Sequence, residues 1–218
     1  MPYELDHVFI CTDPGAPVAQ RLIELGLVEG SPNVHPGQGT ANRRFYFHNT
    51  MIELLYVTDE AELRSPLVQQ IRLSERFRWR QTAACPFGIC LRSTDAADPA
   101  PFATFDYMAP WLPEGTAIPM ARGAMTVEPL LFIKPDSMQG GAATSEPVEH
   151  PLGLRQMTGV HVVSAGCELP SDSLRAVQRQ GIVSVSQGEG HLLELTFDGG
   201  QRGKAADLRP ELPLVVSW

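Results

Sequence analysis

The sequence predicts an α+β fold in which repeated βαβββ units form cupped, mixed sheets with helices packed outside them. Two observations support this prediction. Residues 3–12 alternate like a strand, and a helix-like segment and three further strand-like runs follow before residue 58. A similar order of elements begins again near residue 86 and, less completely, near residue 158. Strands interrupted by single helices suit sheets that are covered by helices.

The first predicted unit covers residues 3–58. Apolar side chains recur at helical spacing in residues 17–25, and Gly26 ends this helix. The other strands of the unit are expected at residues 28–34, 44–48 and 51–57, with a tight turn between the last two.

A connecting helix is predicted over residues 65–81, because Ser65 can cap its start and Pro66 fits its first turn. The second unit is expected at 86–135 and completes a paired domain of residues 1–135. Its elements are predicted to be strands at 87–92, 115–120 and 129–134 and a short helix at 101–107.

The composition changes after residue 135. Residues 136–157 are predicted to be a linker or surface loop, because Gly, Ala, Ser and Pro dominate between Pro135 and Pro147. Residues 158–218 are expected to form a third, degenerate βαβββ-like unit packed on the same domain. Its elements are predicted at 160–164, 173–180, 182–186, 191–197 and 214–218.

Size and charge exclude several classes of function. The 218 residues are 43% hydrophobic, enough to bury a sizeable core, and the net charge of −8 argues against nucleic-acid binding. The arginines within residues 72–80 are interpreted as a solvated helix face. No run approaches the ~20 apolar residues of a spanning helix, and no signal peptide is evident, so we expect a cytoplasmic protein without membrane partners.

The four cysteines have neither metal-type nor redox-type spacing. We expect them to be reduced and mostly buried, with a reactive thiol at Cys11 as the alternative. They are Cys11, Cys85, Cys90 and Cys167.

Two polar side chains fall in apolar rows. Glu53 lies in such a row on the fourth strand, and on the first strand His7 is expected to share a face with Leu5, Phe9 and Cys11. Burying a lone carboxylate is costly unless it is paired or bound to a metal. A divalent ion would satisfy both His7 and Glu53, and imidazole nitrogen with carboxylate oxygen suits Zn, Ni, Mn or Fe(II). The alternative is a hydrogen-bonded structural histidine and a solvent-facing glutamate.

Three segments of the first unit carry a resemblance to a known family. The first strand contains Leu5-Asp6-His7, a glycine-rich loop reads His35-Pro36-Gly37-Gln38-Gly39-Thr40-Ala41-Asn42, and Glu53 is central in the fourth strand. In this order they resemble the glyoxalase-like domain proteins of the vicinal oxygen chelate superfamily. Turn geometry alone would also explain the proline and glycines of the loop.

The resemblance implies a cupped pocket in which His7 and Glu53 are metal ligands and the paired unit supplies the others. His35, Thr40 and Asn42 are then expected to contact substrate. The second unit departs from the pattern, since its matching positions fall near Gly88 or Ile89 and near Ile133 or Lys134. Lys134 could instead pair with Glu53 or hold an anionic substrate. His161 and Glu194 could complete the metal site, but they are expected on the exposed faces of their strands.

The expected function is a metal-dependent isomerase or lyase acting on a small oxygenated metabolite, with Glu53 as the group that moves a proton. One alternative is a metal-free protein that binds and sequesters a small molecule. Another is an extradiol-type dioxygenase, which is less favoured because only one histidine is placed at the site. A purely structural role is the last alternative. A small molecule is the expected partner, and a homodimer that exchanges units between chains is compatible with the sequence.

Overall fold

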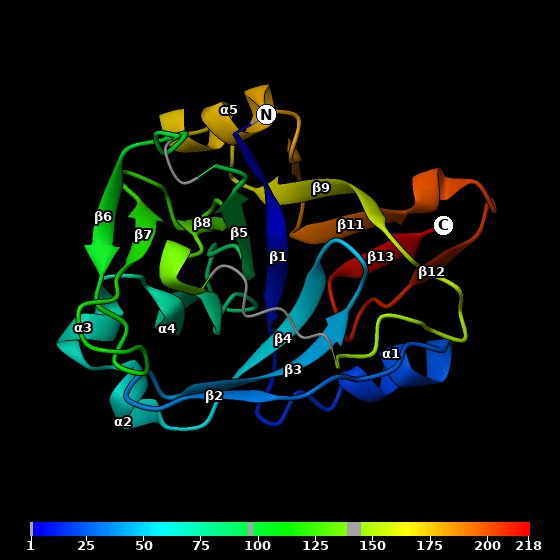
Figure 1. Ribbon diagram of the computed structural model, residues 1–218, viewed down its shortest axis with the longest axis horizontal. Coiled ribbons are helices and arrows are strands. Elements are labelled where there is room, and N and C mark those ends of the chain that lie inside the picture. The colour runs from blue at the N-terminus through cyan, green and yellow to red at the C-terminus, as the bar shows by residue number, and fades with distance from the viewer. Residues whose placement is uncertain (1, 96–97, 139–144) are drawn as a thin grey trace.

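The computed structural model describes residues 2–95, 98–138 and 145–218, and these residues form two β-sheets (Figure 1). The strands of the larger sheet are β1 (Tyr3–Cys11), β2 (Asn33–His35), β3 (Thr40–Tyr46), β4 (Met51–Val57), β5 (Phe87–Ser93), β6 (Thr104–Tyr107), β7 (Ile118–Ala121) and β8 (Leu130–Ile133). The strands of the smaller sheet are β9 (Met157–Ala165), β10 (Ser184–Gly188), β11 (Leu192–Phe197), β12 (Ala205–Asp207) and β13 (Leu214–Ser217).

The helices are short. They are α1 (Ala19–Leu25), α2 (Glu60–Leu63), α3 (Pro66–Gln69), α4 (Leu73–Arg76) and α5 (Asp172–Arg179), with 3₁₀ turns at Asp136–Met138 and Asp198–Gly200. Within the described residues, no helix combines the length and the apolar character that crossing a membrane requires.

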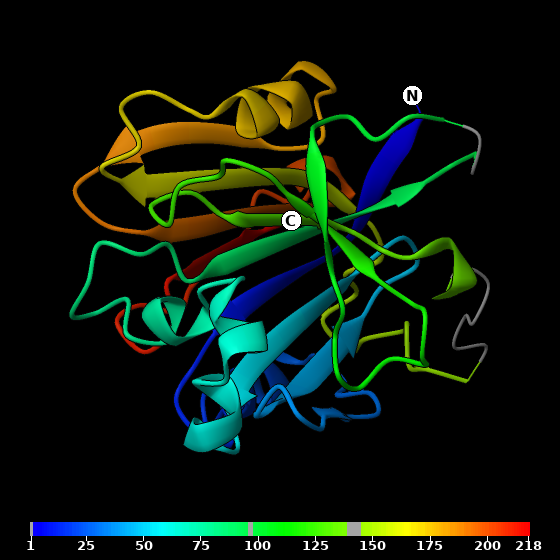
Figure 2. The same ribbon diagram turned by 90° about the vertical axis from the view of Figure 1, so that its left-hand side faces the viewer.

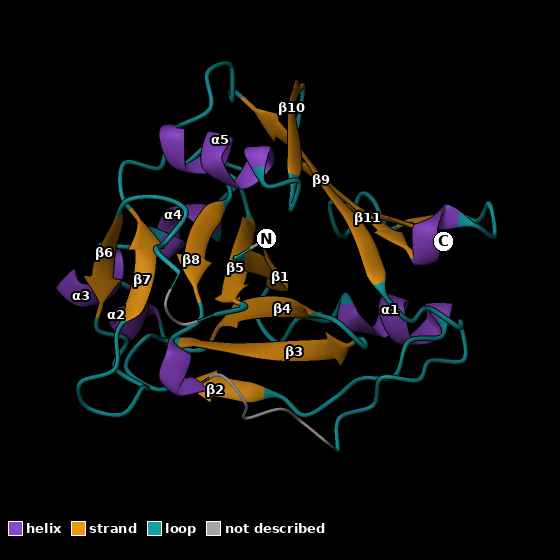
Figure 3. Ribbon diagram, turned by 45° about the horizontal axis from the view of Figure 1, so that its top comes forward, coloured by secondary structure: helices purple, strands orange, loops and turns teal. Residues whose placement is uncertain are grey.

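The larger sheet joins two half-sheets edge to edge within one chain. Its strand order is β2-β3-β4-β1-β5-β8-β7-β6. At the centre β1 and β5 pair antiparallel, and each has a parallel outer neighbour, β4 beside β1 and β8 beside β5. The sheet curves strongly, so that β2 and β3 turn toward the same side as β6 and β7 (Figure 3). The predicted α+β fold with cupped mixed sheets is therefore confirmed.

The smaller sheet packs on the convex side of the larger one (Figures 1 and 2). One apolar cluster joins the outward faces of β1, β4, β5 and β8 to β9, β11 and β13, with α1 and α5 contributing at its edges. Phe47 of the first module contacts Phe197 of β11 with ring centroids 4.5 Å apart. A second apolar cluster lies on the concave side, where α2, α3 and α4 close one end of the cup.

Two predicted helices differ in the structure. The connecting helix over 65–81 is broken into α3 and α4, because Arg72 between them adopts a left-handed backbone with φ of 53°. Ser65 does cap α3, as predicted. The helix predicted at 101–107 is instead strand β6, which pairs with β7 and packs Tyr107 into the concave cluster. Between β5 and β6 the described residues contain no helix.

The solvated face predicted for the arginines of residues 72–80 is wrong for Arg76, which is 2% exposed. Its guanidinium donates hydrogen bonds to the carbonyl oxygens of Cys85 at 2.8 Å and Glu128 at 2.7 Å. A buried cation thus ties α4 to the chain segments that precede β5 and β8.

The third unit has the predicted order of elements but not the pairing of the first. In its strand order, β10-β9-β11-β13-β12, the parallel neighbour of β9 is β10, the next strand in the chain. In the first module the parallel neighbour of β1 is its last strand, β4. The strand β12 was not predicted. Residues 139–144, in the first half of the predicted linker, lie outside the described residues.

His150 connects the segment before the smaller sheet to the first unit through two hydrogen bonds. Its Nδ1 accepts a hydrogen bond from the Val28 N–H at 3.0 Å, and its Nε2 donates to the carbonyl oxygen of Tyr46 at 2.7 Å. Burial lowers the pKa of His150 below its ordinary value. A proton on Nδ1 would remove the acceptor that the Val28 N–H uses.

The lowered pKa of His150 predicts a loss of stability in mild acid. A depressed folded-state pKa gives stabilisation that is present above the unfolded pKa of about 6.5 and is lost as the pH falls through the folded pKa. In urea titrations at about pH 7.5 and about pH 5, we expect the unfolding free energy of the wild type to fall more than that of His150→Gln. Equal losses in the two proteins would contradict this prediction.

Candidate functional site

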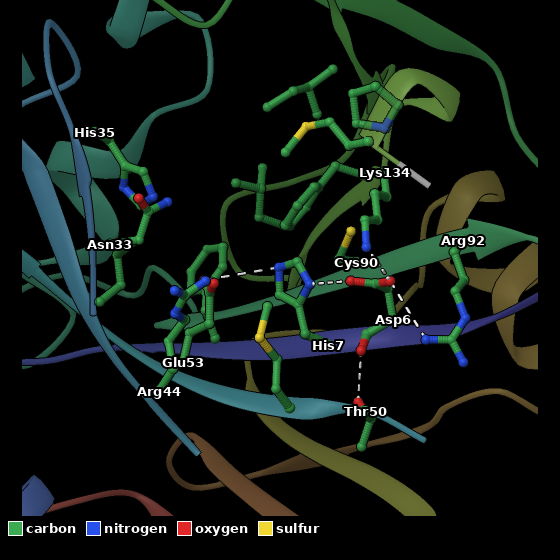
Figure 4. Close-up of a pocket in the computed structure, with 18 of the residues that line it drawn as sticks. Asp6, His7, Asn33, His35, Arg44, Thr50, Glu53, Cys90, Arg92 and Lys134 are labelled. Atoms are coloured by element: carbon green, nitrogen blue, oxygen red, sulfur yellow. Dashed lines mark hydrogen bonds and ion pairs between the residues drawn. The ribbon is translucent and has the colours of Figure 1, made fainter. Parts of the chain in front are cut away.

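The concave side of the larger sheet holds a pocket with a volume of about 470 Å³. Its two ends differ in chemistry. Apolar walls come from β1, β4, β8 and the segments around β6 and β7, and include Phe9, Leu55, Tyr107, Met120 and Phe132. The polar end is built around β1 (Figure 4) and is lined by Asp6, His7, Glu53, Cys90, Arg92 and Lys134.

A β-bulge in β1 places two consecutive polar side chains in this pocket. Leu5 pairs with Leu91 and His7 pairs with Cys90, which leaves Asp6 as the extra residue between them. Asp6 and His7 therefore both line the pocket, whereas Leu5 packs against the cluster on the other side of the sheet. The predicted common face of Leu5 and His7 is wrong for this reason. The hydroxyl of Thr50 donates to the carbonyl oxygen of Asp6 at 2.8 Å.

Asp6 is a buried carboxylate surrounded by partners. Its Oδ1 lies 2.7 Å from Nδ1 of His7, and its Oδ2 lies 3.2 Å from Nζ of Lys134 and 3.5 Å from Arg92. Burial acts to raise the pKa of Asp6, but the hydrogen bond and charge of His7 and the charge of Lys134 lower it well below its usual range. Asp6 therefore holds His7 through Nδ1 and leaves Nε2 to face the pocket.

Glu53 is oriented in a similar way from the other side. It is 9% exposed, and its Oε1 accepts a hydrogen bond from Nδ2 of Asn42 at 3.0 Å. Asn42 is in turn fixed by the N–H of Asn33, which donates to its Oδ1 at 2.9 Å. The second oxygen of Glu53, Oε2, lies 3.8 Å from Nε2 of His7. The free atoms of the two side chains thus face each other across the polar end of the pocket.

The imidazole of His7 lies among groups that favour a positive charge. Burial opposes that charge, but the Cys90 side chain, the Glu53 carboxylate and the hydrogen bond to Asp6 raise the pKa of His7 well above its usual value. The edge of the ring packs against Phe132, with centroids 5.6 Å apart. Because the raised pKa favours a proton on the ring, a metal ion that binds Nε2 must displace the proton from that nitrogen.

Cys90 enters the site from the second half of the sheet. Its sulfur and one donor atom each of Asp6 and His7 lie within 4.8 Å of one another, so these groups could contribute to a metal site. The cysteines are free and buried, as expected, and burial raises the pKa of both Cys11 and Cys90. This argues against a reactive thiolate at Cys11. Local patterns in the sequence do not reveal that Cys90 lies opposite His7, because this depends on the pairing of strands 83 residues apart in the chain.

The second-unit positions that match His7 and Glu53 lie on different faces of the larger sheet. Ile89 and Ile133 point into the outer cluster, while Lys134 lines the pocket and pairs with Asp6 rather than with Glu53. Gly88 lies beside the Phe9 ring, and a Cβ there would come within 2.0 Å of it. The second half of the sheet thus offers the pocket Cys90, which pairs with His7, and Lys134, the one polar side chain among the matching positions.

The glycine-rich loop divides its predicted residues between two roles. His35 lines the pocket, whereas Thr40 and Asn42 are fully buried behind it and hydrogen-bond to His35 and Glu53. Gly39 has φ of 72°, and a Cβ there would lie 2.1 Å from the carbonyl oxygen of Asp59. The glycine is therefore required by both backbone conformation and space.

His161 and Glu194 lie elsewhere. They face each other on the smaller sheet, with Nε2 and Oε2 3.9 Å apart and side chains 33% and 46% exposed. His161 is also hydrogen-bonded to the hydroxyls of Ser184 and Ser186. Neither residue lines the pocket on the concave face of the larger sheet.

A family model described as a glyoxalase-like domain matches residues 5–128, which run from within β1 to beyond β7 and make up more than half of the chain. The chain belongs to the glyoxalase-like domain family. It is thereby a member of the vicinal oxygen chelate superfamily. In this glyoxalase-like protein the matched segment contains His7, Glu53 and Cys90. No curated protein matches the chain.

Two solved structures align with the chain. A hypothetical protein from Staphylococcus aureus has a similar fold, with a TM-score of 0.55 and 12% identity over 99% of this chain and 98% of that chain. That likeness covers the smaller sheet as well. A xylose isomerase-like TIM barrel/4-hydroxyphenylpyruvate dioxygenase fusion protein aligns with a TM-score of 0.49 and 11% identity, over 90% of this chain and 36% of that chain.

The donor set fits a divalent ion at the polar end. Nε2 of His7 and Oε2 of Glu53 are the free donor atoms, and the remaining polar atom of each side chain is held by a buried hydrogen bond. A carboxylate on the second ring nitrogen is the usual support of a metal-binding histidine. Further coordination positions would be supplied by Cys90 or by oxygens of a bound molecule.

Proposed function

We propose that this glyoxalase-like protein is a metal-dependent enzyme of the isomerase or lyase type that acts on a small oxygenated metabolite. The observation that carries the proposal is the 3.8 Å separation of Nε2 of His7 and Oε2 of Glu53, each fixed by a buried partner behind it. Two immobilised donors aimed at one point can supply two of the ligands that a divalent ion needs.

The side chains around this point define the roles we propose. A bound divalent ion supplies Lewis-acid polarisation of substrate oxygens. In this proposal Asp6 accepts the Nδ1 hydrogen of His7, Glu53 takes or returns a proton, and Lys134 attracts an anionic part of the substrate. The apolar walls would hold the carbon skeleton and exclude water from it. The extradiol-type branch stays less favoured, since its usual ligands are two histidines and one carboxylate, and Cys90 stands beside His7.

Metal analysis of the purified protein tests the proposal. The protein is treated with a chelator, reconstituted separately with Zn, Ni, Mn or Fe(II), and freed of unbound ion before elemental analysis. We expect about one ion per chain to be retained for at least one of these metals, as a site with buried supporting partners predicts. Failure to retain any of them would overturn metal dependence.

A second candidate is a metal-free protein that binds and sequesters a small molecule. The observation that favours it is that none of the matching second-unit positions, Gly88 or Ile89 and Ile133 or Lys134, offers a metal-ligating side chain, and that the cation Lys134 lines the pocket. In this case the ion pair of His7 with Glu53 would itself be the functional arrangement. Small molecules would then raise the melting temperature equally with and without a chelator, because binding to the folded state alone is stabilising.

A further inference from the structure

A chain of hydrogen bonds in the wall of the pocket ends at His35, and of its members only Thr40 does not line the pocket. The indole N–H of Trp111 and the hydroxyl of Tyr107 both donate to Oε1 of Gln38, at 3.2 and 3.0 Å. Nε2 of Gln38 donates to the hydroxyl oxygen of Thr40 at 2.9 Å. That oxygen lies 2.9 Å from Nδ1 of His35. The chain links β6 and the segment after it to β3 and β2.

The direction of every hydrogen bond in this chain follows from its first member. An indole N–H can only donate, so the atom of Gln38 that faces Trp111 must be the amide oxygen. The amide nitrogen of Gln38 then faces Thr40 and donates to it. The hydroxyl oxygen of Thr40 accepts this bond, and the hydroxyl hydrogen must be donated to another acceptor.

The Thr40 hydrogen has one acceptor among the described residues, which is Nδ1 of His35. Thr40 is fully buried, so water cannot take that hydrogen, and buried hydroxyls are as a rule paired. Nδ1 of His35 must therefore present its lone pair, and the ring hydrogen must be on Nε2. Burial also lowers the pKa of His35, which agrees with a neutral ring.

Nδ1 of His35 faces the buried Thr40, which leaves Nε2 for the pocket that His35 lines. His35 lines the pocket together with Asn33, and Figure 4 shows both side chains projecting from β2 on the same side as Glu53. The ring is held against Trp111, with centroids 4.7 Å apart. No described residue hydrogen-bonds to Nε2, so this donor is available to a bound molecule.

We propose that Gln38 and Thr40 hold His35 as the neutral Nε2–H tautomer, so that His35 positions the substrate by donating a hydrogen bond to one of its oxygens. The proposal rests on the pocket being the small-molecule site of the proposed function, but not on a metal. A neutral donor selects an acceptor oxygen, such as a carbonyl, and rejects a group of the same shape that lacks a lone pair. His35 is thus a positioning and specificity-determining residue, opposite the ion pair of Lys134 with Asp6.

The first test reads the tautomer directly. Two-bond ¹H–¹⁵N correlation spectra of the chelator-treated protein show which ring nitrogen carries hydrogen, and His35→Phe assigns the signals. We expect Nε2–H alone in the wild type at neutral pH. In Gln38→Glu the new carboxylate only accepts, so the Thr40 hydroxyl turns toward it, and Nδ1 of His35 is expected to gain a hydrogen. Thr40→Ser keeps the hydroxyl and should match the wild type.

The second test asks whether the donor is used by a ligand. Acetophenone and α-methylstyrene have nearly the same shape, but only acetophenone has an oxygen that can accept. We expect wild-type protein, again chelator-treated, to bind acetophenone about tenfold more tightly, as one buried hydrogen bond allows. The preference should disappear in His35→Phe and shrink in Gln38→Glu. The Nε2–H signal of His35 should shift on adding acetophenone.

A hydrogen on Nδ1 of His35 in the wild type would overturn the proposal, and so would the absence of any preference for acetophenone. If Nδ1 of His35 still carried no hydrogen in a folded Gln38→Glu protein, Gln38 would not be what selects the tautomer. Because all measurements use protein without metal, failure to retain an ion in reconstitution leaves these results unaffected. Conversely, a protein that holds one ion per chain but shows the wrong tautomer refutes only the role of His35.

Discussion

His7→Ala is expected to remove the divalent ion entirely, so that elemental analysis after reconstitution finds none where the wild type holds about one per chain. The physical reason is that Nε2 of His7 is one of the two free donor atoms that face each other at the polar end of the pocket. Glu53 alone, tied to Asn42 through its other oxygen, would be a single carboxylate ligand. The chain should stay folded, since His7 contacts the pocket rather than the core between the sheets.

Matched variants separate loss of a ligand from loss of structure. His161→Ala also removes a strand histidine beside a glutamate, but on the smaller sheet, and it should keep the ion. Asp6→Asn retains an acceptor for Nδ1 of His7 but loses the charge, and it should weaken metal affinity by about 10–100-fold. Stoichiometric metal in a folded His7→Ala protein would refute a site built on His7 and Glu53.

Removing residues 152–218 is expected to abolish folding of the remaining chain, although the segment matched by the family model would be intact. The convex face of the larger sheet is apolar and is covered by β9, β11 and β13, so truncation would expose it to water. We expect the fragment to be aggregated or to lack a cooperative melting transition. Circular dichroism, thermal melting and binding of a dye specific for exposed apolar surface measure this.

A point substitution in the same interface measures how much the contact between the sheets contributes to the free energy of unfolding. Phe197 is fully buried and contacts Phe47 across the two sheets, so Phe197→Ala should reduce the free energy of unfolding by about 3–5 kcal/mol. Glu194→Ala, on the same strand but exposed, should change it by less than about 0.5 kcal/mol. A soluble, cooperatively melting fragment of residues 1–151 would show instead that the smaller sheet is dispensable for folding.

Local patterns in the sequence were sufficient for most strands, because alternation of apolar residues depends only on neighbours in the chain. Residues of β1, β4, β9 and β11 were placed in this way. The break at Arg72 and strand β6 were not predicted. The reason is that helical spacing between residues 65 and 81 does not reveal a left-handed residue, and the pairing of β6 depends on β7.

The candidate site was predicted only where one strand sufficed. His7 and Glu53 stood out because each interrupts an apolar row, and the structure lines the pocket with both. Asp6 was missed, since strict alternation sends it to the opposite face, and only the pairing with β5 reveals the bulge. Thr40 and Asn42 were expected to contact substrate, yet they are fully buried and do not line the pocket, because a glycine loop does not show which of its polar residues become buried.

The bulge at Asp6 also means that β1 carries one residue more than its scaffold needs. If Asp6 were deleted, Leu5 would still oppose Leu91 and His7 would still oppose Cys90, now in unbroken register. No other side chain of the strand would change face. The alternation of core-facing and pocket-facing side chains in β1 therefore does not depend on Asp6, which behaves as a single-residue insertion. Losing or gaining it alters the chemistry of the pocket while leaving the architecture in place.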